Sequence, residues 1–364
     1  MTKHSFHGWD LAVKLVAWQR QHGRQHLPWQ HTQDPYRVWL SEIMLQQTQV
    51  TTVIGYYERF LHAFPTVQAL ANATQDEVMP YWAGLGYYAR ARNVHRCAQI
   101  ICTEYGGQFP SQSQTLATLP GIGRSTAAAI AAFCFGERAP IMDGNVKRVF
   151  TRFFGVEGHP QQRAVEQQLW ALAEQVLAYS PADLNMAHYT QSLMDLGSLI
   201  CTRRRPTCEA CPLKAHCYAF AHGLTEALPT PKVRPSKPER SVQMLIVQTP
   251  SHVLLTQRPS EGIWGGLQVP LLFETKGDLE QMLRTHQAST HALEVLQPFW
   301  HVFSHFKLHI HPYLLSCNQP WPVEDAQFWL PREAISKAAL PAPVKKVFAA
   351  LALAAQDTRL FNAH

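Results

Sequence analysis

The sequence predicts a mainly α-helical N-terminal region followed by a separate α+β domain. Apolar residues recur at helical spacing through about the first 225 residues, where strand-like alternation is scarce. The stretch Pro229–Pro238 then contains four prolines and three basic residues, which is typical of an extended, semi-rigid tether. Beyond it, short runs with a period of two indicate strands.

Composition agrees with a multi-domain chain. The 364 residues predict two or three domains, and a hydrophobic content of 46% is ample for their cores. Lys and Arg outnumber Asp and Glu by 19 to 16 in residues 1–228 and by 4 to 1 in residues 229–240, and the two are equal thereafter. This surplus mildly favours an anionic partner. The first residues lack an apolar signal core, and no run of eighteen uncharged apolar residues occurs, so we expect a soluble protein from a reducing compartment.

Helices are predicted at four places in the first region. Apolar spacing indicates helix through Trp39–Phe60, and Thr74–Glu77 is a capping box that begins the next one. The alanine-rich stretch Ser125–Phe135 and the stretch Val165–Ala178 complete the set.

In the last third, Val242–Gln248 and His252–Gln257 are predicted strands joined by a Thr-Pro-Ser turn. Polar and apolar residues alternate through Phe303–Leu315, the pattern of a half-buried strand. An amphipathic helix, Pro343–Ala355, closes the domain.

Four cysteines lie close together with the spacing C-x6-C-x2-C-x5-C: Cys201, Cys208, Cys211 and Cys217. Four thiolates this close can bind one metal centre. The spacing leaves structural zinc and a [4Fe–4S] cluster about equally open. A disulfide is a weaker alternative, because disulfides are rare in the cytosol. We interpret the other cysteines as core thiols: Cys97, Cys102, Cys134 and Cys317.

Basic residues lie within the same segment. Arg203, Arg204 and Arg205 fall in the first cysteine interval and Lys214 in the last. The segment could therefore lie against phosphate, and a solvated loop is the alternative.

The segment Leu119–Thr126 reads as a tight turn between two helices. Pro120 ends the first helix, and two glycines leave backbone amides uncovered at the start of the second, where such amides bind phosphate oxygens. An aspartate, Asp143, follows 22 residues after Gly121 in a glycine-containing turn.

This combination resembles the helix-hairpin-helix DNA glycosylases, and the cysteine group resembles their endonuclease III branch, which favours [4Fe–4S] over zinc. Three stretches closely resemble the MutY family of adenine DNA glycosylases: Trp39–Val50, Gly84–Arg92 and Asp143–Val149. The resemblance runs from about residue 24 to 217 and reappears at Trp264–Leu267 and Phe303–His305.

The resemblance implies an enzyme that flips adenine out of double-stranded DNA, where it is mispaired with 8-oxoguanine or guanine, and excises it hydrolytically. It also implies one [4Fe–4S] cluster, a monomer without a membrane partner, and a place in the bacterial cytoplasm at the nucleoid. Strand-cutting relatives have a Schiff-base lysine where this chain has Ser125. A hydroxyl cannot form an imine, so we expect a monofunctional glycosylase.

Two carboxyl groups carry the expected chemistry. Glu42 is the acid, because partial burial on an apolar helix should raise its pKa. Asp143 is the ionised partner. The resemblance implies that Asn145 holds Asp143 and the water, and Ser125 stands where some relatives have a tyrosine. The alternative for Glu42 is a charge on the helix surface. The alternative for Asp143 is a turn or helix N-cap residue, a role that it could combine with catalysis.

The adenine-pocket and intercalation roles come only from the resemblance. The adenine pocket is assigned to Arg24, Trp29, Gln191 and Asp195. Gln47 and Tyr87 are assigned to DNA intercalation, with core packing as the alternative. The phosphate-binding hairpin is assigned to Gly121, Ile122 and Gly123.

The last domain resembles the MutT (Nudix) fold. A Nudix hydrolase needs R-E-x-x-E-E, and residues 262–285 have only the scattered Glu274 and Glu280, so we expect no hydrolysis there. Recognition of 8-oxoguanine is assigned to Phe303, Ser304 and His305. The expected domains are 1–228, with a six-helix subdomain at about 30–136 and a cluster subdomain from 1–29 and 137–228; a linker at 229–240; and 241–364.

Two rival functions remain. A lesion-binding protein without catalysis would lack the acid pair, but Glu42 and Asp143 are both present. A glycosylase with lyase activity on oxidised pyrimidines would need the missing lysine.

Overall fold

The computed structural model describes residues 8–232 and 236–361. The chain divides into two compact units, the first comprising Met1–Asn72 and Asn93–Arg234 and the second Ala73–Arg92 and Pro235–His364. Residues 1–7, 233–235 and 362–364, which fall in the predicted cluster subdomain, tether and last domain, lie outside the described residues. Within the described ranges, no helix is both long and apolar enough to cross a bilayer.

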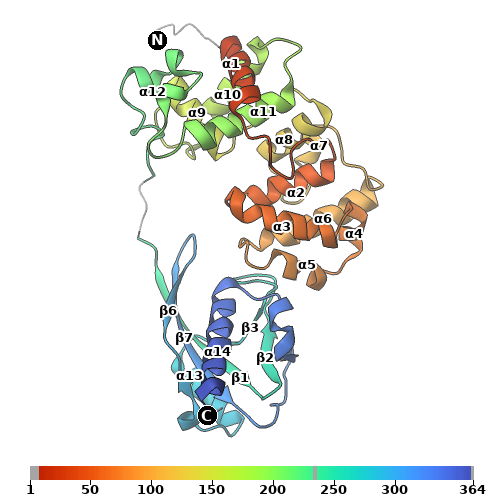
Figure 1. Ribbon diagram of the computed structural model, residues 1–364, viewed down its shortest axis with the longest axis vertical. Coiled ribbons are helices and arrows are strands. Elements are labelled where there is room, and N and C mark those ends of the chain that lie inside the picture. The colour runs from red at the N-terminus through yellow and green to blue at the C-terminus, as the bar shows by residue number, and fades with distance from the viewer. Residues whose placement is uncertain (1–7, 233–235, 362–364) are drawn as a thin grey trace. The chain divides into compact units, whose positions relative to one another are not determined.

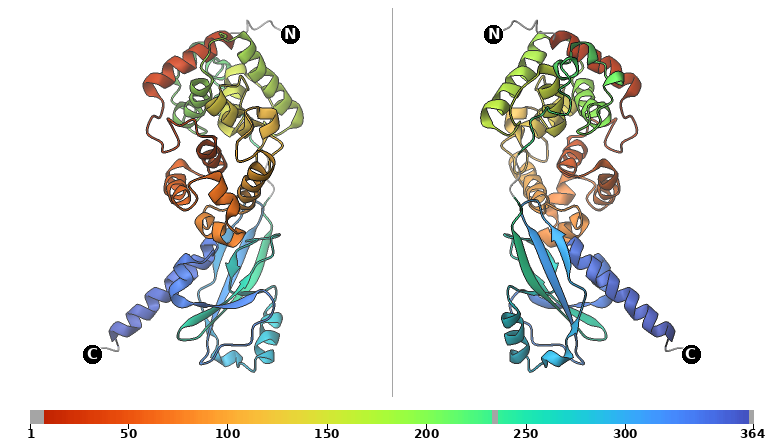
Figure 2. Two further views of the ribbon diagram at one scale, coloured as in Figure 1. Left: turned by 90° about the vertical axis from the view of Figure 1, so that its right-hand side faces the viewer. Right: turned by 90° about the vertical axis from the view of Figure 1, so that its left-hand side faces the viewer.

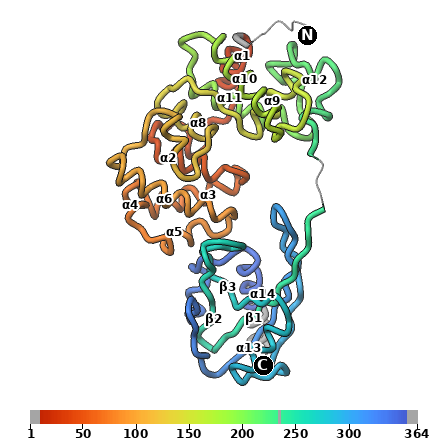
Figure 3. The backbone as a smooth tube through the Cα atoms, turned by 180° about the vertical axis from the view of Figure 1, so that it is seen from behind, coloured from red at the N-terminus to blue at the C-terminus, as the bar shows by residue number. Residues whose placement is uncertain are grey.

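The first unit is helical, as predicted (Figure 1). Its elements are α1 (Gly8–His22), α2 (Pro35–Leu45), α3 (Val50–Ala63), α4 (Val67–Asn72), α6 (Ala89–Glu104, with its first turn in the second unit), α7 (Ser113–Leu116), α8 (Arg124–Phe135), α9 (Gly144–Phe154), α10 (Arg163–Tyr179), α11 (Met186–Asp195), the π-helical turn η1 (Leu196–Ile200), the 3-10 turns η2 (Cys208–Ala210) and η3 (Lys214–His216), and α12 (Tyr218–Ala221). Helices from the two ends of this unit lie together, with α1 against α10 and α11 (Figures 1 and 3). Their apolar faces share one core with α8 and α9.

A continuous helix through Trp39–Phe60 was the wrong expectation. Helix α2 ends at Leu45 and α3 begins at Val50. Between them Gln47 has φ of 58°, a left-handed conformation that a right-handed helix excludes. Buried residues recur at helical spacing in both helices, so the apolar period alone could not reveal the break.

Other predicted helices are confirmed. Helix α8 covers the alanine-rich stretch, and α10 covers the stretch predicted to end at Ala178. The capping box is present at the start of α5 (Gln75–Trp82), in the second unit. There the Thr74 hydroxyl accepts from Glu77 N–H at 3.3 Å, and Glu77 Oε2 accepts from Thr74 N–H at 2.7 Å.

The second unit is a mixed sheet with helices, which confirms the α+β prediction (Figure 2). Its remaining elements are β1 (Glu239–Gln248), β2 (His252–Gln257), β3 (Gln268–Val269), β4 (Leu271–Phe273), α13 (Lys276–Thr285), η4 (Thr290–Ala292), β5 (Glu294–Val295), β6 (Phe299–Val302), β7 (Lys307–Ser316), β8 (Gln327–Pro331), η5 (Arg332–Lys337) and α14 (Ala342–Phe361). Strand β1 pairs in parallel with β7 and antiparallel with β2, and α13 packs on one sheet face against Leu245 and Val247.

The alternating stretch at residues 303–315 is only partly a strand. Strand β7 begins at Lys307, and its inward residues alternate with half-exposed ones. Residues 303–306 instead form the turn that joins β6 to β7, closed by a hydrogen bond from Phe303 N–H to Phe306 O at 2.9 Å. Ser304 and His305 in this turn are exposed, whereas Phe306 is buried.

Two glycines that end helices allow a matched test of packing. Gly136 ends α8 and Gly155 ends α9, with φ of 69° and 67°. A Cβ at Gly155 would lie 2.3 Å from Tyr218 Cδ1, whereas one at Gly136 would meet nothing within 4 Å. We expect Gly136→Ala to cost about 1 kcal/mol, the penalty of the left-handed conformation. Gly155→Ala should cost about 1–3 kcal/mol more, because the ring must move. Urea denaturation followed by circular dichroism measures both, and equal costs would contradict the close approach.

Candidate active site

A cavity of ≈ 1280 Å³ lies in the first unit, where α2, α8, the start of α9, α11 and the loop after α1 meet. Two carboxyl groups line it: that of Glu42, in α2, and that of Asp143, which is the residue before α9. They are distant in sequence, and the charge on Asp143 contributes to the raised pKa of Glu42. The structure therefore brings together the two residues expected to be catalytic.

Glu42 is held by the buried face of α2. Its neighbours Ser41 and Ile43 are buried, and the Ser41 hydroxyl donates to Val38 O at 2.8 Å. Burial, with a smaller contribution from the charge on Asp143, raises the pKa of Glu42 to about 8. The carboxyl group therefore carries a proton at neutral pH and can act as an acid.

Asp143 caps the N-terminus of α9. Its Oδ1 accepts hydrogen bonds from Asn145 N–H at 2.9 Å and Val146 N–H at 2.8 Å. Burial raises the pKa of Asp143, and these two N–H groups, with Arg148 and Lys147, oppose that rise. Because donors and a helix N-terminus favour the charged form, we assign the negative charge of the pair to Asp143.

Ser125 and Asn145 both line the cavity beside Asp143. The Ser125 hydroxyl accepts from Met142 N–H at 2.9 Å, which fixes the backbone just before Asp143. Asn145 Oδ1 accepts from Arg148 Nη2 at 2.8 Å. Ser125 thus positions the backbone that carries the Asp143 carboxylate.

Lysine is absent from the described residues that line this cavity. Lys147, four positions after Asp143, forms an ion pair with Glu166 at 2.6 Å. The described lining residues therefore include no lysine amine that could form a Schiff base.

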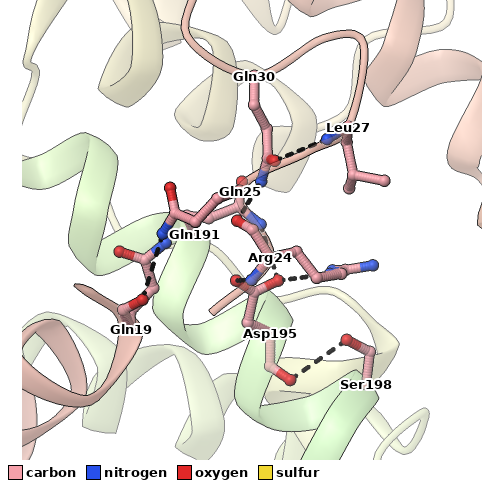
Figure 4. A network of polar contacts seen from close by, with 8 residues as sticks. All are labelled: Gln19, Arg24, Gln25, Leu27, Gln30, Gln191, Asp195 and Ser198. Atoms are coloured by element: carbon pink, nitrogen blue, oxygen red, sulfur yellow. Dashed lines mark hydrogen bonds and ion pairs between the residues drawn. The ribbon is translucent and has the colours of Figure 1, made fainter. Parts of the chain in front are cut away.

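Three of the four expected adenine-pocket residues line the cavity, namely Arg24, Trp29 and Gln191. Asp195 is fully buried and is not a lining residue, but it lies beside Arg24 and Gln191 (Figure 4). It accepts from Arg24 Nε at 2.7 Å, from Arg24 N–H at 3.0 Å and from Gln191 Nε2 at 3.0 Å. Asp195 thus holds two lining side chains in place.

Gln30 also orders this loop, a role that sequence reasoning missed. Its Nε2 donates to Arg24 O at 2.9 Å, and its Oε1 accepts from Leu27 N–H at 3.0 Å (Figure 4). Trp29 packs edge-on against Tyr57, with 5.4 Å between ring centroids. The loop after α1, which lines the cavity, is therefore held in place by hydrogen bonds and aromatic packing.

The four cysteines of the predicted metal site follow η1 and are free thiols. The Cys211 thiol interacts electrostatically with the other three, which places the four in one neighbourhood. Among the described residues, no group of three or more His, Cys, Asp or Glu side chains is arranged to hold a metal ion.

Two arginines of α9 bind the cysteine segment. Arg148 Nε donates to Cys201 O at 2.7 Å, and its Nη2 donates to Gly197 O at 2.5 Å. Arg152, only 2% exposed, donates to Thr202 O at 2.7 Å and lies 3.4 Å from Cys201 Sγ. One helix therefore carries Asp143 at its start and positions the cysteine segment along its length. Sequence reasoning missed both arginines, because their acceptors are mainly backbone carbonyls remote in the chain.

The expected phosphate-binding hairpin is formed between α7 and α8. Gly121 has φ of 77°, and a Cβ there would lie 2.9 Å from Asn93 Cβ. Ile122 is buried and anchors the turn, and Gly123 precedes α8 without a side-chain cap. The start of α8 thus has the open form that suits an anion.

Both expected intercalating residues have left-handed backbones. Gln47 is exposed at the break between α2 and α3 and lines the cavity. Tyr87, in the second unit, has φ of 50° and is 47% exposed, with Arg90 5.5 Å from its ring. Neither is a core residue, which argues against the packing alternative. Such φ values are costly for non-glycine residues and often occur at functional sites.

The three residues assigned to 8-oxoguanine recognition lie in the turn between β6 and β7. Phe303 stacks on the buried Phe306, with centroids 4.5 Å apart, and anchors the turn. Ser304 and His305 are exposed at the tip, where Ser304 Oγ lies 3.3 Å from His305 Nδ1.

Comparisons with known proteins find related families and structures. Residues 40–175 match the family described as HhH-GPD superfamily base excision DNA repair protein, and residues 242–350 match the NUDIX domain. The adenine DNA glycosylase of Buchnera aphidicola (subspecies Acyrthosiphon pisum) is 34% identical over 95% of this chain and 97% of its own length. The chain belongs to the adenine DNA glycosylase family. The human adenine DNA glycosylase is also 34% identical, over 92% of this chain and 72% of its own length.

Solved structures show the same fold for the helical part of this adenine DNA glycosylase family member. A thermostable thymine-DNA glycosylase has a TM-score of 0.52 and 27% identity, covering 58% of this chain and 95% of its own. A non-covalent endonuclease III–DNA complex has a TM-score of 0.50 at 20% identity, covering 60% and 98%. The predicted family and two-part fold class are thereby confirmed.

The raised pKa of Glu42 predicts a cost to stability. Because the folded state holds this proton to about pH 8, the stability that the protonated group contributes is complete below the ordinary glutamate pKa and is lost as the pH rises through about 8. Glu42→Gln removes the titration, so its melting temperature should exceed that of the wild type at about pH 8.5, with a smaller difference at about pH 5. Glu226→Gln, at an exposed site, is the control and should show no such trend. A pH-independent difference for Glu42→Gln would contradict the assignment.

Proposed function

We propose that this chain is a monofunctional adenine DNA glycosylase that removes adenine mispaired with 8-oxoguanine or guanine and leaves an abasic site. The observation that carries the proposal is that Glu42 and Asp143 line one cavity, where burial raises the pKa of Glu42 to about 8. Cleavage of an N-glycosidic bond needs a proton for the leaving base and negative charge near the sugar. This pair can provide both.

In the proposed reaction Glu42 donates its proton to the adenine ring as the bond to the sugar breaks. The bonding electrons leave with the base, and positive charge develops on the sugar. The Asp143 carboxylate stabilises that charge, and water adds to the sugar carbon. The added water gives up its proton to the surrounding solvent, from which the Glu42 carboxylate is protonated again. Asn145 beside Asp143 would help to position the water.

Adenine reaches this cavity only if it leaves the base stack. We assign Gln47 and Tyr87 to the gap in the duplex, because both are exposed on strained backbone. The hairpin before α8 would bind backbone phosphate. Arg24, Trp29 and Gln191 would line the pocket for the flipped base, with Asp195 beside Arg24 and Gln191.

The four cysteines would hold one [4Fe–4S] cluster. The arginines Arg148 and Arg152, which lie against the cysteine segment, suit a set of anionic thiolates. When bound, the cluster would crosslink the segment and stabilise the fold around α9. Nearby basic residues, Arg203 to Arg205, would face phosphate.

The last domain would read the base opposite the adenine. The Ser304 hydroxyl is exposed and can accept from the N7–H that 8-oxoguanine has and guanine lacks. We further propose that residues 229–240 tether this domain to the helical region, that the protein is a monomer, and that it acts at the bacterial nucleoid.

Removing either carboxyl group tests the mechanism. Glu42→Gln and Asp143→Asn should each lower single-turnover adenine excision, for Glu42→Gln by about 10²–10⁴-fold. Affinity for the mispaired duplex, measured by gel shift, should stay near that of the wild type. The wild-type rate should fall as the pH rises through about 8, because the acid then loses its proton. Undiminished turnover in both variants would refute the roles.

Spectroscopy and metal analysis test the cofactor. Protein purified without oxygen should be brown and contain about four iron atoms per chain. Cys211→Ser should lose colour and iron and melt at a lower temperature, whereas Cys97→Ser, at a buried core thiol, should keep both colour and iron. Stoichiometric zinc in colourless, active wild-type protein would refute the cluster.

A further inference from the structure

Lys237, near the end of the proline-rich stretch, bonds to the turn between β6 and β7. Its Nζ donates to the Phe303 carbonyl at 2.6 Å, and the lysine side chain is partly buried. The next residue, Pro238, accepts from Lys307 N–H at 2.9 Å on the other side of the turn. The segment that leads into β1 therefore holds both ends of the turn, and all these residues belong to the second unit.

The ring of Phe303 is already fixed by packing. It stacks on Phe306 with planes 18° apart, and it meets His301 edge-on at 4.6 Å. Phe306 is itself 1% exposed, with the Arg240 guanidinium 4.9 Å from its ring. What these rings leave free is the orientation of the peptide that joins Phe303 to Ser304.

Lys237 removes that freedom. In a planar trans peptide the C=O and the N–H point in opposite directions. With the Phe303 carbonyl fixed on Lys237, the Ser304 N–H must point away from the lysine. A bond from an ammonium group to a carbonyl is stronger than a neutral one, so the peptide has one strongly preferred orientation.

The orientation matters for the base expected at this turn. On the edge that distinguishes them, 8-oxoguanine has an N–H donor at N7 and an O8 acceptor, whereas guanine has a bare N7 acceptor. A flipped peptide would present the Phe303 carbonyl where the Ser304 N–H should be, and the turn would then offer the wrong pattern to O8. Selectivity between the two purines therefore depends on keeping this peptide in place.

We infer that Lys237 is a positioning residue that enables discrimination between 8-oxoguanine and guanine, because it fixes the Phe303–Ser304 peptide. This inference rests on the proposed function. The competing role for a linker lysine is a plain phosphate contact. A phosphate contact would change affinity for every duplex alike and would depend on salt.

The experiment measures single-turnover excision of adenine opposite 8-oxoguanine and opposite guanine with the whole chain. The quantity compared is the excision efficiency, which is the maximal rate constant divided by the protein concentration that gives half of that rate. Lys237→Met removes the donor and keeps the side-chain length. Lys237→Arg keeps a charged donor. Lys232→Met is the matched control, because Lys232 is an exposed lysine of the same stretch that bonds to Gln161 instead. Ser304→Ala reports on the turn itself.

Lys237→Met should lower the excision efficiency opposite 8-oxoguanine about tenfold and change the efficiency opposite guanine by no more than about twofold. Lys237→Arg should restore most of the loss, and Lys232→Met should not change the ratio. Equal losses on both duplexes in Lys237→Met, or no loss, would overturn the role of Lys237. Two other outcomes would instead overturn the proposed function. One is a wild-type protein that does not excise adenine. The other is a wild-type protein whose rates opposite 8-oxoguanine and guanine are equal, or whose preference for 8-oxoguanine is unchanged in Ser304→Ala.

Discussion

Two carboxyl groups facing one cavity are the constraint on which the site depends. Burial and mutual repulsion make two charges there unfavourable, so one group must keep its proton. The asymmetry comes from the backbone. Asp143 receives two N–H bonds at the start of α9, whereas Glu42 lies in the last turn of α2, away from the helix N-terminus. The different attachment of the two residues to their helices thus sets which group is acid and which is anion.

Helix α9 links this pair to the rest of the first unit. Its arginines bind backbone carbonyls from η1 to the segment beyond the cysteines, so its position depends on how that segment is folded. Contact with η1 is close, since a Cβ at Gly197 would lie 2.5 Å from Asn145 Cβ. The cysteine segment can therefore affect the carboxylate by holding a helix in place, without touching the cavity.

Local patterns predicted local structure well. The hairpin glycines, the capping box and the N-cap role of Asp143 depend on neighbours within a few residues, and each was visible in the sequence. The break at Gln47 was not visible in the sequence, because the apolar period is the same in the helices before and after it. The pairing of Glu42 with Asp143 came from family resemblance, since spacing says nothing about helices that meet through folding. Arg152 and Gln30 escaped notice because backbone carbonyls are their main partners, and every residue has one.

The hydrogen bond from Met142 N–H to Ser125 has a consequence for how such enzymes could interconvert. A lysine at this position would supply the amine that strand cleavage requires, but it would also take away the acceptor that steadies the peptide before Asp143. Gaining the second activity would thus impair the first until another residue received that N–H. A single codon change is therefore a poor evolutionary route from base removal to backbone scission, and divergence between the two branches should involve compensating substitutions in the adjoining loop.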